Sequence, residues 1–324
     1  MAPLTYFPQL RLPRSRNSSG AMYMIAGMLT LQVGSALAVH LFPAVGPAGT
    51  AWLRISFAAI LLVAVTFRKL GRELRTATRR DLAAAALLGA VSAGMTLCYS
   101  QAVARIPMGT ATAIEFTGPL LVAVLAAHRR RELVWLGAAV AGLLMLTQPW
   151  SGASDLGGLL WAAGAAGCWA VYILATQAVG ERFSGVNGLA LAMVSGAIVA
   201  APFGAPAVVA NPQLWVIASA AGIAVLMPLL PYAMDLEALR RLTRTVYGTF
   251  AGLEPAVAAI VGAVVLAQLP GLGQTLGILL IVAAGVGAAR AGSRQELGVG
   301  ETRVVASGGP AAATSVAEPD RVNA

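Results

Sequence analysis

Long apolar stretches separated by short polar segments fill most of this chain. Each stretch is long enough to cross a hydrocarbon core of about 30 Å at about 1.5 Å of helix rise per residue. The pattern therefore predicts an all-α membrane protein with ten transmembrane helices. The expected spans cover roughly residues 21–40, 50–67, 82–103, 108–127, 133–149, 157–178, 186–204, 213–234, 245–267 and 272–289.

The composition agrees with a multi-pass membrane protein. Of 324 residues, 58% are hydrophobic and 11% are charged, whereas soluble domains have about 25% charged residues. The formal net charge is +9, but 20 of the 22 Lys and Arg residues fall in segments that share one side of the predicted membrane, or in the two tails. Such an excess marks the cytoplasmic side. We therefore expect both termini in the cytoplasm, a plasma (inner) membrane location, a lipid bilayer as environment and no nucleic-acid partner.

The ten predicted spans divide into two sets of five, and the second set resembles the first. The stretch from Thr110 to Pro119 aligns with the stretch from Val246 to Pro255 at an offset of 136 residues. Because five is odd, the second copy would enter the membrane from the opposite side, an inverted repeat typical of transporters. The expected organisation is a cytoplasmic tail, two five-helix repeats and a disordered cytoplasmic tail rich in Gly, Ala and Ser, at residues 1–20, 21–149, 150–290 and 291–324.

Three ionisable acidic or basic side chains lie within the predicted spans: Arg54, Glu115 and Glu254. A charged side chain at membrane depth costs several kcal/mol, so each is a candidate functional residue. Pro119 follows Glu115 by one helical turn and should bend that helix. We interpret this stretch as the wall of a cavity. Two structural alternatives stay open: Glu115 protonated inside the bundle, and Arg54 extending to the outer headgroups.

Arg54 and Glu115 have similar predicted depths, so together they offer a cation site and an anion site for an amino-acid zwitterion. Polar and aromatic residues elsewhere in the spans are candidates for lining the same cavity, although each is equally suited to bonding between helices. They are Gln32, Tyr99, Gln101, Thr112, Trp169 and Tyr172. Four prolines are candidate helix breaks or hinges: Pro119, Pro228, Pro231 and Pro255.

The residues of metal and nucleophile chemistry are few and scattered. Cys98 and Cys168 lie inside apolar spans, and His40 and His128 lie at span ends without forming a cluster. We therefore expect no metal, no cofactor, no disulfide framework and no enzymatic activity. A channel is disfavoured because no polar ring or selectivity loop is visible. The oligomeric state is not predicted.

Several stretches resemble the EamA-like drug/metabolite transporter superfamily, and within it the threonine/homoserine exporter branch. They are Tyr99-Ser-Gln-Ala-Val-Ala-Arg-Ile-Pro-Met-Gly109, Ala113-Ile-Glu-Phe-Thr-Gly-Pro-Leu120, Leu236-Glu-Ala-Leu-Arg-Arg-Leu242 and Leu253-Glu-Pro-Ala-Val-Ala-Ala259. The resemblance covers about residues 21–290. It implies export of small amino acids or related metabolites by exchange with protons. Lipophilic cations and nucleotide-linked metabolites are the alternative cargoes.

Proton exchange needs a side chain that gains and loses a proton within the membrane. Burial disfavours the charged form of a carboxylate, so Glu115 can hold a proton from outside and release it to the cytoplasm, in competition with an ammonium group of the substrate. Glu254 is the second candidate, in a Leu-Glu-Pro sequence that also suits a packing role. We expect Glu115 to be the coupling residue because Thr112, Thr117 and the Pro119 break surround it.

Overall fold

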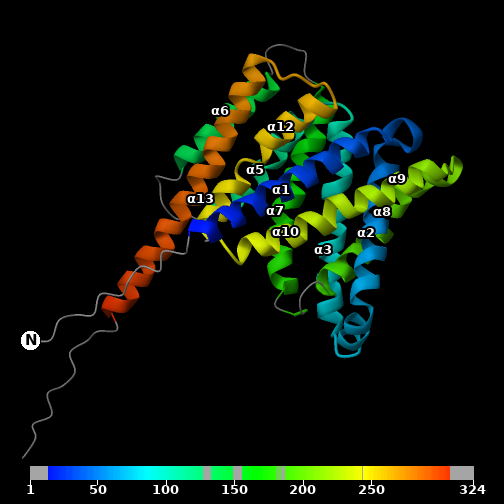
Figure 1. Ribbon diagram of the computed structural model, residues 1–324, viewed down its shortest axis with the longest axis horizontal. Coiled ribbons are helices and arrows are strands. Elements are labelled where there is room, and N and C mark those ends of the chain that lie inside the picture. The colour runs from blue at the N-terminus through cyan, green and yellow to red at the C-terminus, as the bar shows by residue number, and fades with distance from the viewer. Residues whose placement is uncertain are drawn as a thin grey trace, which may run out of the picture.

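The computed structural model describes residues 14–126, 133–148, 155–180, 182–183, 187–242 and 244–306. All regular elements in these ranges are helices (Figure 1). They are α1 (Arg14–Val39), α2 (Phe42–Leu74), α3 (Arg79–Val103), α4 (Met108–Glu115), α5 (Thr117–Ala126), α6 (Leu133–Thr147), α7 (Leu156–Gly180), α8 (Asn187–Ala210), α9 (Leu214–Ala224), the π-helix η2 (Val225–Leu229), α10 (Leu230–Leu239), α11 (Arg244–Ala251), α12 (Glu254–Val265) and α13 (Leu272–Ala306).

The predicted all-α membrane character is confirmed, but ten uninterrupted spans are not. Among the described residues, seven helical stretches are long and apolar enough to cross a membrane, and 133–147 and 214–227 are shorter apolar helices. The run at 108–127 is divided into α4 and α5. The difference arises mainly from interruptions of the helical hydrogen bonds, which an apolar run does not reveal. The last helix continues to Ala306, and residues 307–324 of the predicted tail lie outside the described part.

The first interruption lies at Phe116, between α4 and α5. Pro119 has no N–H, so it cannot donate to the carbonyl of Glu115 one turn earlier. The hydroxyl of Thr117 donates to the carbonyl of Ile114 over 2.6 Å, which satisfies one carbonyl beside the break. The helix is therefore interrupted three residues before the proline.

A second interruption occupies the matching place in the other set of helices. Gly252 and Leu253 form a turn between α11 and α12. Pro255 is the second residue of α12, where a missing N–H breaks no helical hydrogen bond. Pro255 therefore begins a helix, and the break itself precedes it.

Two prolines distort the eighth apolar run, as expected. Pro228 lies within η2 and Pro231 follows in α10, and neither can donate a backbone hydrogen bond. The N–H of Leu230 reaches back to the carbonyl of Val225. That five-residue spacing is the π-helical bond, which often occurs at functional sites.

The helix that carries Arg54 begins earlier than predicted. α2 starts at Phe42, and its first turn is separated from the rest by Gly46, whose φ of 69° suits glycine. Pro47 then begins the regular helix. Arg54 follows Pro47 by seven residues, about 10 Å along the helix axis, whereas a helix that begins at residue 50 would place it about 6 Å from the helix start.

Helices from the two sets pack on each other throughout the bundle. α1 packs on α10, α2 on α8, α3 on α7 and α8, α4 on α12, and α6 on α13 (Figure 1). At the α4–α12 crossing, a Cβ on Gly109 would lie 2.8 Å from the Cα of Ala259. The crossing thus brings two backbones together through a glycine, as is common where helices pack in lipid.

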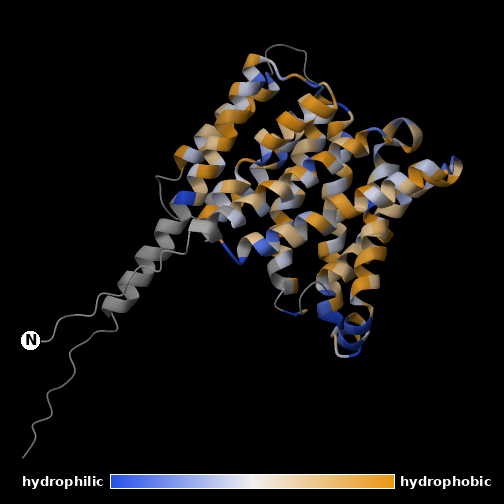
Figure 2. Ribbon diagram, in the orientation of Figure 1, coloured by the Kyte–Doolittle hydropathy of each residue, from blue (hydrophilic) through white to orange (hydrophobic). Residues whose placement is uncertain are grey.

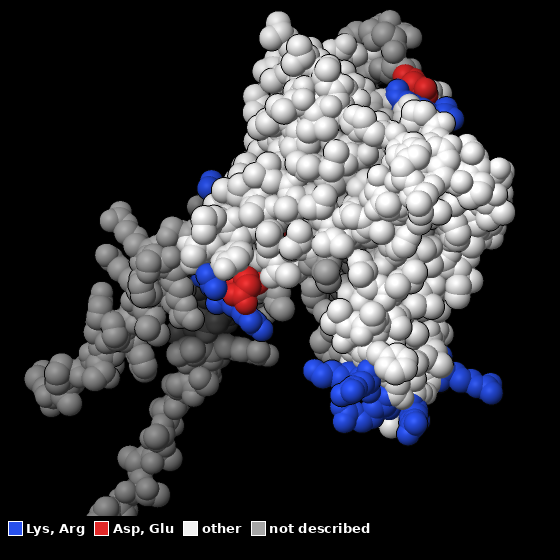
Figure 3. Space-filling model, turned by 45° about the vertical axis from the view of Figure 1, so that its right-hand side comes forward, with Lys and Arg blue, Asp and Glu red and all other residues white. Residues whose placement is uncertain are grey.

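The outer surface is apolar along the bundle and basic at the α2–α3 connection. Large hydrophobic side chains such as Val65, Leu125 and Val264 are more than 70% exposed, and apolar residues cover much of the outer helices in Figure 2. Basic side chains gather at the end of α2 and the start of α3 (Figure 3). These exposed residues are Arg68, Lys69, Arg72, Arg75, Arg79 and Arg80.

Candidate functional site

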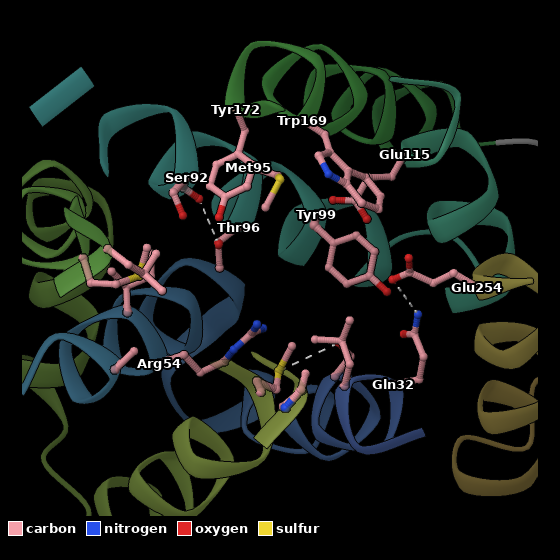
Figure 4. Close-up of a pocket in the computed structure, with 18 of the residues that line it drawn as sticks. Gln32, Arg54, Ser92, Met95, Thr96, Tyr99, Glu115, Trp169, Tyr172 and Glu254 are labelled. Atoms are coloured by element: carbon pink, nitrogen blue, oxygen red, sulfur yellow. Dashed lines mark hydrogen bonds between the residues drawn. The ribbon is translucent and has the colours of Figure 1, made fainter. Parts of the chain in front are cut away.

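A cavity of about 340 Å³ lies between the two sets of helices (Figure 4). We call it the central cavity. Its wall combines apolar side chains with a smaller number of ionisable, hydroxyl and amide side chains, and both sets of helices contribute. The lining residues are Leu31, Gln32, Ser35, Arg54, Ile55, Ala58, Ser92, Met95, Thr96, Tyr99, Glu115, Trp169, Tyr172, Leu189, Met193, Met227, Pro231, Asp235 and Glu254. A few charged groups within an otherwise apolar wall are typical of a small-molecule site.

The structure brings Arg54 and Glu115 to the same cavity. In Figure 4, Arg54 extends from α2 into the open middle, and Glu115 lies across it with Trp169 and Tyr99. The two charges interact electrostatically. Within the described part of the chain, however, Arg54 belongs to none of the ion pairs within 4 Å, and its Nε has no hydrogen-bond partner. The guanidinium therefore keeps donors for another anion.

Glu254 begins α12 and also faces the central cavity. The side-chain amide of Gln32, on α1, donates to Oε1 of Glu254 over 3.4 Å. Glu115 lines the same cavity. The α4–α5 and α11–α12 breaks thus each present a carboxylate to one space.

The three aromatic residues predicted for the site, Tyr99, Trp169 and Tyr172, all line the central cavity. The hydroxyls of Tyr99 and Thr112 lie 2.9 Å apart and share a hydrogen bond. Thr112 is 1% exposed and does not line the central cavity. Its hydrogen bond therefore positions the Tyr99 hydroxyl without contributing to the cavity wall. Trp169 meets Phe116 edge-to-face, with ring centroids 6.1 Å apart. Tyr172 lines the cavity as expected.

Two of the expected lining residues, Thr112 and Gln101, do not line the central cavity, and Asp235, which was not expected, does. Gln101, on α3, does not line the central cavity, because it lies two residues beyond Tyr99 and projects in another direction along the helix. Asp235 does line it and was missed because the eighth span was expected to end at residue 234. α10 continues to Leu239. The signal was available: Asp235 lies one helical turn after Pro231, so the same helix face carries both residues.

A second cavity of about 510 Å³ adjoins the central one. Leu31, Trp169, Pro231, Asp235 and Glu254 line both. The rest of its wall comes from α1, from the α4–α5 break, and from α7, α11 and α13: Met24, Gly27, Met28, Phe116, Pro119, Leu120, Ile173, Tyr247, Gly248, Ala251, Gly285, Ala288 and Ala289. The two cavities therefore meet at a shared wall that contains two carboxylates and one indole.

The family profile of the EamA-like transporter family matches this chain twice, over residues 18–147 and 156–288. The chain belongs to the EamA-like transporter family. The two matched segments lie on either side of residues 148–155. This EamA protein is also 36% identical over 272 residues to the threonine/homoserine exporter RhtA of Salmonella typhimurium strain SL1344, covering 82% of the chain and 90% of that relative.

Two further comparisons concern a second relative and a solved structure. The threonine/homoserine exporter RhtA of Escherichia coli strain K12 is 35% identical over 269 residues, with 82% of this chain and 89% of that protein covered. A solved structure titled "Crystal structure of protein" covers 86% of this chain and 99% of its own, with a TM-score of 0.57 at 19% identity. That likeness concerns the fold alone. The relatives are named as exporters, in agreement with a multi-pass membrane transport protein.

Proposed function

We propose that this EamA-family protein exports small amino acids of the threonine/homoserine type in exchange for protons. The observation that carries the proposal is the placement of Arg54, which has no ion-pair partner among the described residues, in the same cavity as Glu115. An amino-acid zwitterion needs one group of each sign. The names of the RhtA relatives support the same substrate class.

Each end of the substrate has a complementary group in the central cavity. The planar guanidinium of Arg54 suits a carboxylate, which it can bind through two parallel hydrogen bonds. Glu115 suits the ammonium group. Ser92 and Thr96 supply hydroxyls from α3 for a polar substrate side chain. The volume of about 340 Å³ is near the lower end of the range for ligand pockets, which favours a small substrate.

We further propose that the ten apolar runs form two inverted five-helix repeats. Numbered in chain order, the first run packs on the eighth, the third on the sixth, and the second, fourth and fifth on the seventh, ninth and tenth. If each run is exchanged with its counterpart five places away in the other set, the same five pairs result. A two-fold axis that relates the two halves would produce this pattern of packing. Because each half has five runs, the halves would enter the membrane from opposite sides, with both termini in the cytoplasm.

The cargo alternatives fit the cavity less well. A lipophilic cation would favour carboxylates and aromatic rings without a cation, and Arg54 would repel it. A nucleotide-linked metabolite carries several negative charges, and among the described wall residues Arg54 is the only Lys or Arg opposite three carboxylates. The zwitterion is the substrate that both signs of charge favour.

A substrate panel combined with one substitution tests the proposal. Purified protein in liposomes would be assayed for transport of labelled threonine, homoserine, other amino acids and 1-amino-2-propanol, which is threonine without its carboxylate. Arg54→Gln should weaken threonine transport by at least about tenfold, because a charge-assisted hydrogen bond contributes about 1.5–3 kcal/mol. Arg105→Gln, at a helix end, is the matched control. Threonine transport unaffected by Arg54→Gln would contradict the assignment, and strong transport of a lipophilic cation in place of amino acids would favour the alternative.

A further inference from the structure

Asp235 has a position that the proposed exchange of substrate and proton does not by itself explain. It lies on α10 and lines both cavities, as Glu254 does. Glu115 lines only the central cavity, and Tyr247 only the second. The ionisable groups therefore follow an order in space: Glu115, then the shared pair Glu254 and Asp235, then Tyr247.

The contacts of Asp235 leave its carboxyl open to the cavities. Tyr247, on α11, lines the second cavity together with Asp235, and the two side chains interact. On the other side, α1 passes with Gly27, where an added Cβ would lie 3.5 Å from Oδ1 of Asp235. Gly27 itself lines the second cavity. A glycine at this point keeps the space beside the carboxyl free of a side chain.

The charged neighbours of Asp235 connect it to the central site. Glu254, on α12, interacts electrostatically with Asp235 and with Glu115. On α1, Tyr23 lies beneath the guanidinium of Arg241, with 4.6 Å between the guanidinium carbon and the ring centroid. Glu237, on the same helix as Asp235, is paired with Arg240 and Arg241 at 2.9 Å. Of these groups, Glu254 alone shares both cavities with Asp235.

We propose that Asp235 is a proton-relay residue that links Glu254 to the second cavity. A protonated Glu254 gives its proton to the Asp235 carboxylate through water in the shared space, which leaves Glu254 ionised and Asp235 neutral. Asp235 then releases the proton to water in the second cavity, while Tyr247 holds the ionised carboxylate in place. Glu254 is then ready to accept the next proton from the side of Glu115. No co-reactant other than water is needed.

This inference rests on the proposed proton exchange, so its test separates proton movement from substrate movement. Full-length protein in liposomes would be assayed for threonine accumulation driven by a pH gradient, and for threonine counterflow at equal pH on both sides. Asp235→Asn should lower gradient-driven accumulation by at least about tenfold, as expected for loss of a proton-transfer group, and should lower counterflow by a much smaller factor. Glu237→Gln on the same helix should leave both activities unchanged, since an exposed ion pair contributes about 0–1 kcal/mol.

Each other result overturns the relay. If Asp235→Asn still accumulates threonine against the pH gradient as the wild type does, protons do not pass through Asp235. If the variant is folded but loses counterflow as well, Asp235 serves substrate movement and is not a relay. If the wild type performs counterflow but never responds to a pH gradient, proton exchange fails and the relay fails with it. If the wild type transports no amino acid in either assay, the proposed substrate class fails, and the relay that rests on it is overturned as well.

Discussion

The side-chain amide of Gln32 donates a hydrogen bond to Glu254 over 3.4 Å, and this contact joins the first and second sets of helices inside the membrane. The two residues are 222 positions apart. Gln32 is only 2% exposed, so its amide has little access to water. The bond positions the Glu254 carboxyl at the wall shared by the two cavities.

We expect Gln32→Leu to damage both stability and transport. The substitution removes a donor from a buried carboxylate, and an unsatisfied buried polar group costs about 1–3 kcal/mol. The melting temperature in detergent should fall, and gradient-driven threonine transport should decline with it. Gln101→Leu removes an amide that lies outside the central cavity and is the matched control. Equal losses for the two variants would show that the Glu254 contact has no special role.

The close crossing of α4 and α12 gives a second prediction. Gly109→Ala places a Cβ 2.8 Å from the Cα of Ala259, so one helix must move. Overpacking of this kind typically costs about 1–3 kcal/mol. Gly137→Ala, on α6, is the control because a Cβ there would meet no atom within 4 Å. Thermal unfolding should show a clear loss for Gly109→Ala alone, and equal stability of the two variants would contradict the crossing.

The proposed orientation is tested by labelling single cysteines in cells. In a background with Cys98 and Cys168 replaced by alanine, Arg75→Cys should react with an impermeant maleimide only after the membrane is permeabilised. Leu269→Cys should react in intact cells, because Leu269 is 83% exposed and lies in the α12–α13 connection, which the proposal puts outside. Reaction at position 75 from outside would reverse the orientation or exclude the inverted repeat.

Much of the bundle was predictable because apolar runs reveal where helices lie. They do not reveal how a helix is interrupted. Pro119 predicted a bend, but the turn at Phe116 and the corresponding break at Gly252–Leu253 depend on local hydrogen bonding. The π-helix η2 likewise could not be predicted, because it is defined by the hydrogen bond from the N–H of Leu230 to the carbonyl of Val225. These interruptions matter for function because Glu115 and Glu254 sit directly beside them.

The site was predictable where a charge stood inside an apolar run. Arg54, Glu115 and Glu254 all line the central cavity, since burial of a charge in a membrane protein requires a polar surrounding. Asp235 was not predicted as a site residue because it lies one residue past the expected end of its span. Gln101 was misleading, because an amide in an apolar helix bonds between helices as readily as it lines a cavity.

Glu115 binds the substrate ammonium group and the proton alternately in the mechanism that we propose. Purified wild-type protein, Glu115→Gln and Glu254→Gln would be placed in liposomes, and threonine transport driven by a pH gradient would be measured together with counterflow at equal pH. We expect Glu115→Gln to be folded and membrane-inserted, yet to lose gradient-driven transport and to have weakened counterflow. Glu254→Gln should lower gradient-driven transport as Asp235→Asn does but keep counterflow, which is the milder defect overall. If Glu115→Gln still concentrates threonine in response to the pH gradient, the coupling role is wrong and Glu115 is a structural carboxyl.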